Sequence, residues 1–217
     1  MTSNDPLLSD AKIVDSERFN TISHLIGFLL SVLGTAALLV IAAQSGDAWK
    51  MTSFAIYGSM LMVLYGSSTL YHGVQGRSKQ VFQKCDHCSI YLLIAGSYMP
   101  FALVTLRGPW GWTLLGVIWA LALIGIAQEI WTPTRKRARS MLLYVLMGWL
   151  ALVVIFPLWD ALTPLGLGGL LAGGACYTLG IVFYANDHRV RHGHGIWHLF
   201  VLAGSTCHFF TVLLFVA

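Results

Sequence analysis

The feature that most constrains this chain is a series of seven apolar runs, separated by short polar islands. A run of about 20 apolar residues is long enough to cross the hydrocarbon core of a bilayer as one helix. Because lipid offers no hydrogen bonds, a spanning segment must satisfy its own backbone. We therefore predict an all-α integral membrane protein, a bundle of seven transmembrane helices at residues 19–43, 52–72, 86–106, 112–131, 141–159, 165–184 and 195–217.

Composition excludes a soluble domain of ordinary type. Charged residues make up 10% of the chain, whereas soluble domains carry about 25%. The formal net charge of +4 sits in the islands between runs, so we interpret it as a topology signal and predict no nucleic-acid partner. Residues 1–18 are polar and resemble no signal peptide. We predict a short cytoplasmic segment at 1–18, disordered or interfacial, followed by a transmembrane domain at 19–217.

The basic residues predict an orientation. Seven spans place the termini on opposite sides, and basic residues are enriched on cytoplasmic loops. Two of those considered, Lys50 and Arg107, fall on the C-terminal side. Eleven fall on the N-terminal side: Lys12, Arg18, Arg77, Lys79, Lys84, Arg135, Lys136, Arg137, Arg139, Arg189 and Arg191. We therefore predict a cytoplasmic N-terminus and a C-terminus outside.

Several polar residues share one predicted membrane depth. His194 and His198 open the seventh run at an i, i+4 spacing, which puts both imidazoles on one helix face. His72 ends the second run, and Asp86 begins the third. In the predicted topology all four lie near the cytoplasmic side. Polar side chains inside membrane spans usually face a bundle interior or cavity, so we expect these residues to converge.

Three imidazoles and a carboxylate indicate a metal site with a specific chemistry. Catalytic zinc commonly takes three protein ligands and keeps a fourth position for water. His72, His194 and His198 are the predicted ligands. Asp86 is predicted either to orient the water and accept its proton or to hydrogen-bond a metal ligand. Ser68, one turn before His72, is predicted to hydrogen-bond an imidazole or a substrate oxygen. Iron held by two histidines and a carboxylate is the competing interpretation.

Other polar residues receive weaker interpretations. His24 is either a partner of the metal ligands or a plain helix-start residue, and Glu129 is interpreted as interfacial. His208, about 15 Å deeper than His198 at the helical rise, is expected to make a buried hydrogen bond or line a cavity. His87 is interpreted as an interface residue.

Two sequence patterns near the third run were also considered. The Cys85-Asp-His-Cys88 pattern lacks the second CxxC that a zinc ribbon needs. Pro100 predicts a kink in the third span.

Four ordered motifs resemble a known family. They are Glu17-Arg-Phe-Asn-Thr-Ile-Ser-His24, Ser68-Thr-Leu-Tyr-His72, the segment from Asp86 to Phe101, and His194-Gly-Ile-Trp-His198. They are similar to the bacterial hemolysin III proteins of the progestin and adipoQ receptor family, which also contains the adiponectin receptors. The resemblance implies seven helices around a cytoplasmic-side zinc in a bacterial plasma (inner) membrane. It matches His72, His194 and His198 to the zinc histidines.

The resemblance also bears on activity. It matches Asp86 to the aspartate near the zinc-bound water and Ser68 to the family's serine. In relatives the constellation is linked to ceramide hydrolysis, which implies a membrane lipid as substrate or ligand. The long cytoplasmic N-terminal domain of the receptors is not present here.

Three functions are consistent with this pattern. The leading hypothesis is a zinc-dependent intramembrane hydrolase of a ceramide-like lipid amide. The second is a non-enzymatic sensor or lipid-homeostasis protein with structural zinc. The third is a membrane-permeabilising, hemolytic factor.

Overall fold

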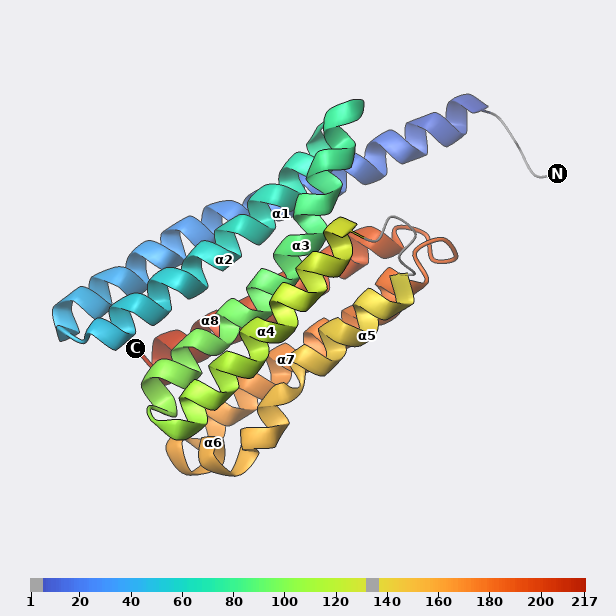
Figure 1. Cartoon of the computed structure of the whole chain (residues 1–217). Helices are drawn as coiled ribbons and strands as arrows, with labels where there is room; N and C mark the ends of the chain where they lie inside the picture. Colours follow the sequence, from blue (N-terminus) through green and yellow to red (C-terminus); the bar gives the residue numbers. More distant parts are fainter. Residues whose placement is uncertain (1–5, 132–136) are drawn as a thin grey trace.

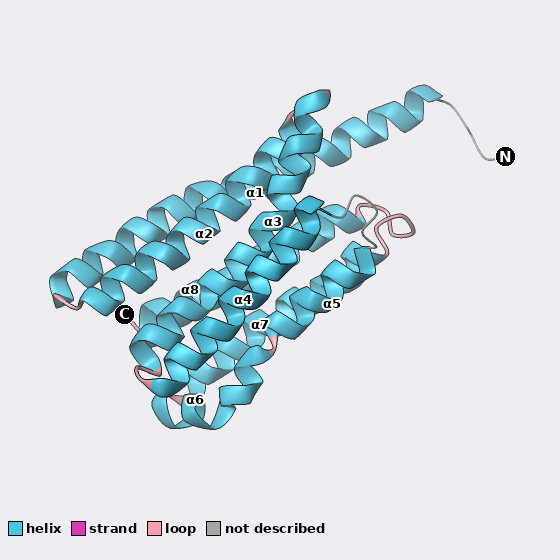
Figure 2. Cartoon of the chain, in the orientation of Figure 1, coloured by secondary structure: helices cyan, strands magenta, loops and turns pink. Residues whose placement is uncertain are grey.

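The fold is a bundle of helices running roughly along one axis (Figures 1 and 2). The computed structural model describes residues 6–131 and 137–217, and every regular element within these ranges is helical. The elements are α1 (Pro6–Ser45), α2 (Ala48–Gly73), α3 (Arg77–Pro100), η1 (Phe101–Thr105), α4 (Pro109–Trp131), α5 (Arg137–Gly148), η2 (Leu150–Val154), α6 (Ile155–Ala161), α7 (Pro164–Ala185) and α8 (Gly193–Phe215). Residues 1–5 of the predicted N-terminal segment, and Arg135 and Lys136 of the topology count, lie outside the described residues.

The all-α membrane class is confirmed, and six of the seven predicted spans are matched. Six helical stretches in the described chain are long and apolar enough to cross a bilayer: Ser16–Ser45, Arg77–Thr105, Pro109–Trp131, Ala138–Ala161, Pro164–Ala185 and Gly193–Phe215. The second predicted span forms α2, a helix of 26 residues, which is not among the six. Serines, tyrosines and glycines interrupt its apolar residues.

Two helices begin earlier than their apolar runs. Helix α1 begins at Pro6, so the described part of the predicted polar segment is helical. Helix α3 begins at Arg77, which places Asp86 more than two turns inside the helix rather than at its start. Apolar composition marks where a helix enters lipid, but helical hydrogen bonding continues into the polar region beyond it.

The kink predicted at Pro100 takes the form of a short π-helical segment. Proline has no backbone N–H for the helical ladder, and η1 follows it directly. The Leu106 N–H donates to the Phe101 carbonyl at 2.7 Å, an i to i+5 bond.

The fifth span also departs from a regular helix, because η2 separates α5 from α6. The Tyr98 hydroxyl donates to the Met147 carbonyl at 2.7 Å and accepts from the Ala151 N–H at 3.1 Å. A neighbouring helix thus satisfies backbone groups that the break frees, as a membrane interior requires.

The helices pack in a defined order. Helix α2 lies between α1 and α3, α4 packs on α3, α7 packs on α8, and α8 also contacts α1. The N-terminal end of α1 and the C-terminal end of α8 lie at opposite ends of the bundle (Figure 1). This order brings the end of α2 and the beginning of α8 to the same end of the molecule.

Close approach of α3 and α4 depends on Gly125. A Cβ at Gly125 would overlap the ring of Tyr91, which is fully buried on α3. Gly116, on the same helix, has no neighbouring atom within 4 Å of such a Cβ. Small residues let membrane helices approach closely.

We therefore predict that Gly125→Ala destabilises the bundle while Gly116→Ala does not. Overpacking a close contact costs about 1–3 kcal/mol, so the Gly125 variant should unfold at a lower temperature in detergent. Thermal unfolding of both variants beside the wild type provides the measurement. Equal transition temperatures for the two variants would contradict the close contact between α3 and α4.

Candidate metal centre

Three histidines from two helices meet at one end of the bundle. His72 lies in the last turn of α2, and His194 and His198 lie in the first turns of α8. Among the described residues, they form a group in which one ligand atom from each lies within 4.8 Å of the others. Their ring centroids are separated by 5.0 Å (72–194), 4.9 Å (72–198) and 4.8 Å (194–198). The predicted convergence of these imidazoles is confirmed.

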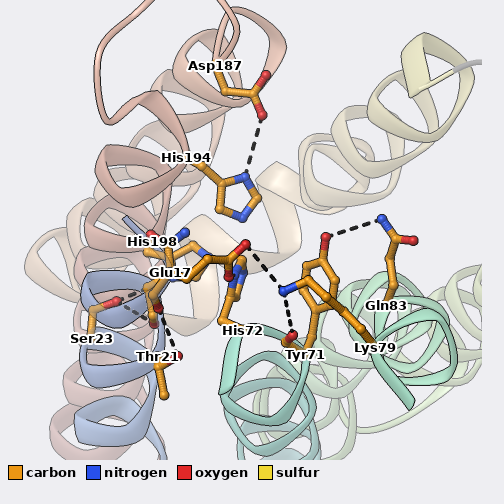
Figure 3. Close-up of polar contacts among 11 residues, drawn as sticks. Glu17, Thr21, Ser23, Tyr71, His72, Lys79, Gln83, Asp187, His194 and His198 are labelled. Atoms are coloured by element: carbon orange, nitrogen blue, oxygen red, sulfur yellow. Dashed lines mark hydrogen bonds and ion pairs between the residues drawn. The ribbon is translucent and has the colours of Figure 1, made fainter. Parts of the chain in front are cut away.

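Each ring presents its Nδ1 to an oxygen atom (Figure 3). His72 Nδ1 lies 2.7 Å from Glu17 Oε2. His198 Nδ1 lies 3.3 Å from Ser23 Oγ, and His194 Nδ1 lies 3.6 Å from Asp187 Oδ2. Metal-bound histidines usually donate their second ring N–H to such an oxygen, which fixes the tautomer and orients the ring. The arrangement leaves the three Nε2 atoms as candidate ligands.

The fit to a metal can be tested on His72. Its Nε2 is buried and has no hydrogen-bond partner among the described residues. Burying an unpaired polar atom costs free energy, and a positive ion at the centre of the three rings would remove that cost. Three imidazoles suit zinc better than magnesium or calcium, which prefer oxygen ligands. The residues present therefore fit a zinc ion.

A cavity leads from the histidines into the bundle. Its volume is about 120 Å³, and it is lined mainly by apolar side chains of α3, α5, η2, α7 and α8. Seven of the polar residues considered above line it: His24, Ser68, Asp86, His87, His194, His198 and His208. Asp86 and Ser68 are buried, with 9% and 1% of their surface exposed. The Ser68 hydroxyl interacts with the Asp86 carboxyl, although no hydrogen bond of regular geometry joins it to a described residue.

His24 belongs to the same cluster. Its ring stacks on His198 with centroids 3.6 Å apart and planes 10° apart, and it meets Tyr65 edge to face. Both ring nitrogens are buried without a partner in the described part of the chain. Of the two interpretations left open by the sequence, the structure thus favours a partner of the metal ligands.

The remaining polar residues lie outside the histidine triad. His87 Nδ1 pairs with Glu129 Oε1 at 2.9 Å, which joins α3 to α4. His208 Nε2 donates to the Leu170 carbonyl at 3.1 Å and lines the cavity, as predicted. Cys85 and Cys88 form no disulfide and belong to no metal-type cluster within the described ranges.

Sequence reasoning gave no role to the oxygen partners Glu17, Ser23 and Asp187. A signal for the first was present, because Glu17, Asn20 and His24 follow one another at i, i+3 and i+7, which places them on one helix face. Asn20 and His24 are buried, so this face of α1 points into the bundle. Asp187 lies in the loop between α7 and α8, where spacing predicts no contact.

We predict that Glu17→Ala weakens zinc binding by about 10- to 100-fold, the usual effect of removing an oxygen that orients a metal-bound histidine. Competition with a chromogenic chelator measures the affinity. Glu129→Ala is the matched control, because it also removes a carboxylate from a histidine, but at His87. A similar loss in both variants would argue against a specific role for Glu17.

Comparisons with known proteins agree with the geometry. A family model described as "Haemolysin-III related" matches residues 13–209. "Hemolysin-3" of Bacillus cereus is 44% identical over 206 residues, which cover 94% of each chain. "Hemolysin-3 homolog" of Bacillus subtilis is 41% identical over 93% of this chain and 95% of its own. "Monocyte to macrophage differentiation factor" of Homo sapiens is 28% identical over 89% of this chain and 81% of its own. The predicted resemblance is thereby confirmed, and the chain belongs to the hemolysin III family within the progestin and adipoQ receptor family.

Proposed function

We propose that this protein is a zinc-dependent intramembrane hydrolase that acts on a lipid amide of the ceramide type. One observation carries the proposal: three imidazoles gather at the end of an apolar cavity whose lining also holds a buried carboxylate and a buried hydroxyl. An apolar cavity suits an acyl chain, and a metal site beside an acid–base group suits hydrolysis.

The proposed topology includes α2 as the seventh span. At 26 residues it is long enough to cross a bilayer, and it packs along two apolar helices, α1 and α3. The excess of basic residues on the N-terminal side supports a cytoplasmic N-terminus. The match to bacterial hemolysin-3 proteins supports a plasma (inner) membrane location.

Five residues of the chain would take part in the proposed reaction. His72, His194 and His198 would hold the ion, which when bound polarises a carbonyl and lowers the pKa of a water molecule. Asp86 lines the cavity from α3 and would accept and return the proton. Ser68 would hydrogen-bond the substrate oxygen, because its hydroxyl faces the same cavity and lacks a regular hydrogen bond to a described residue.

The lipid would enter from the side. Leu152 on η2 and Leu171 on α7 line the cavity and are also exposed on the outer surface, at 48% and 39%. In a bilayer that surface faces acyl chains. An apolar chain could pass between these elements without crossing a polar layer.

We expect about one zinc ion per chain in the purified wild type and its loss in His194→Ala/His198→Ala. The double substitution removes two of three imidazoles, and one remaining histidine cannot hold the ion at low free zinc. Metal content by mass spectrometry on detergent-purified protein measures both. A well-folded wild type that contains no metal would contradict the hydrolase mechanism.

We expect Asp86→Asn to lower lipid-amide hydrolysis by about 100- to 10,000-fold, the usual contribution of an acid–base group, while zinc content stays at the wild-type level. Asp160→Asn, at an exposed position on α6, is the control and should change neither. Hydrolysis of a fluorescent ceramide in mixed micelles provides the rate. If the wild type binds zinc but hydrolyses no lipid amide, the non-enzymatic alternative with structural zinc is favoured instead.

A further inference from the structure

The histidine triad lies beside two spaces with different linings. On one side lies the apolar cavity, which His194 and His198 line. On the other lies a polar pocket at the surface, between the beginning of α1 and the turn from α2 to α3. Its charged and imidazole side chains are Glu17, Arg18, His72 and Lys79. One member of the triad thus lines the pocket, and the other two line the cavity.

A continuous series of polar contacts runs through this pocket to the buried ring (Figure 3). The Lys79 ammonium lies 3.3 Å from Glu17 Oε1, and Glu17 Oε2 lies 2.7 Å from His72 Nδ1. The side chains of Lys79 and Glu17 are about one third exposed, at 31% and 34%, whereas that of His72 is 3% exposed. Solvent thus meets the first two groups, and the second of them touches the candidate ligand.

Lys79 is held firmly across the pocket. Besides the ion pair, its ammonium donates to the Tyr71 carbonyl at 3.2 Å and lies 4.8 Å from the centre of the Tyr71 ring. A lysine with three such partners stays in place longer than one with a single surface ion pair, which contributes little by itself. It keeps a positive charge over the only carboxylate that lines this pocket in the described part of the chain.

A metal ion and a lipid need different routes to the triad. A divalent cation loses its hydration energy in apolar surroundings, at a cost that far exceeds any available gain. The cavity is lined mainly by apolar side chains, and two of them, Leu152 and Leu171, are also exposed on the outer surface. From the surface inward, the pocket presents solvent, the Glu17 carboxylate and the His72 imidazole. Its chemistry is that of a cation route.

We propose that the pocket at Glu17, Arg18, His72 and Lys79 is the route by which zinc reaches and leaves the triad, and that the Lys79–Glu17 ion pair closes it. Glu17 attracts the arriving cation, which then passes the His72 ring to the Nε2 atoms of the triad. The Lys79 ammonium repels the cation and occupies the carboxylate, with Arg18 adding a second positive charge, so exchange is slow. The proposal rests on the proposed zinc site but not on any enzymatic activity.

We expect Lys79→Met to accelerate both zinc uptake and zinc release by about tenfold or more, because a unit positive charge within a few ångströms of the path strongly repels a divalent ion. Uptake is followed on metal-stripped, full-length protein in detergent with zinc ion alone. Release is followed with a chromogenic chelator at concentrations where the rate no longer depends on the chelator. Zinc stoichiometry should remain at the wild-type value.

Two matched variants identify the route. Lys84→Met removes an exposed lysine from the same helix, outside the pocket, and should leave both rates unchanged. Arg189→Met removes an exposed arginine from the loop that carries Asp187, the alternative polar approach to His194. Faster exchange in Lys79→Met alone supports the proposal.

Three results would overturn it. Unchanged rates in Lys79→Met with one zinc bound would show that the ion pair does not control exchange, and would leave the proposed zinc site standing. Acceleration in Arg189→Met alone would assign the route to the Asp187 side. A folded wild type that takes up no zinc would remove this proposal together with the proposed function.

Discussion

The structure depends on burying imidazoles at the end of a membrane bundle, where unpaired polar groups are expensive. Each ring of the triad needs an oxygen on one side and a further partner on the other. The oxygens come from α1 and from the loop before α8. Contacts with the histidines of α2 and α8 therefore help to position these two segments. The triad therefore explains why α1, at the start of the chain, packs against α8, at its end.

Much of the fold could be predicted from the sequence because a segment that spans lipid must satisfy its own backbone hydrogen bonds, which favours helices. Runs of apolar residues gave the helices in their order, and His72, His194 and His198 were identified by their depth. The position of a residue within its span sets its depth in the membrane. The spacing between two residues on one helix decides whether their side chains share a helix face. Both are local properties, so no knowledge of packing is needed to compare them between helices. The limits of α1 and α3 were missed because helices continue past the apolar region.

The partners of the triad could not be predicted in the same way. The contact between Glu17 and His72 joins residues 55 positions apart, and Asp187 reaches His194 from a loop whose course no periodicity describes. Lateral neighbours in a bundle are decided by close approaches such as those at Gly125 and at Gly195, where a Cβ would overlap the Phe19 ring. The polar stripe on α1 predicts that one face is buried, but not against which helix.

The two spaces that meet at His72 follow from one requirement. A site that brings together a lipid and a divalent ion must admit molecules with opposite solvation, and neither can use the route of the other without a large cost. A single wide, wet opening would admit both, but it would expose the apolar cavity to water and weaken the packing that holds the triad. The apolar opening lies at η2 and α7, and the polar one lies at α1 and α3. Lipid and water would therefore meet the protein at different openings. In the proposed function, His72, which is buried and contacts Glu17, would be a ligand that also lines the polar pocket.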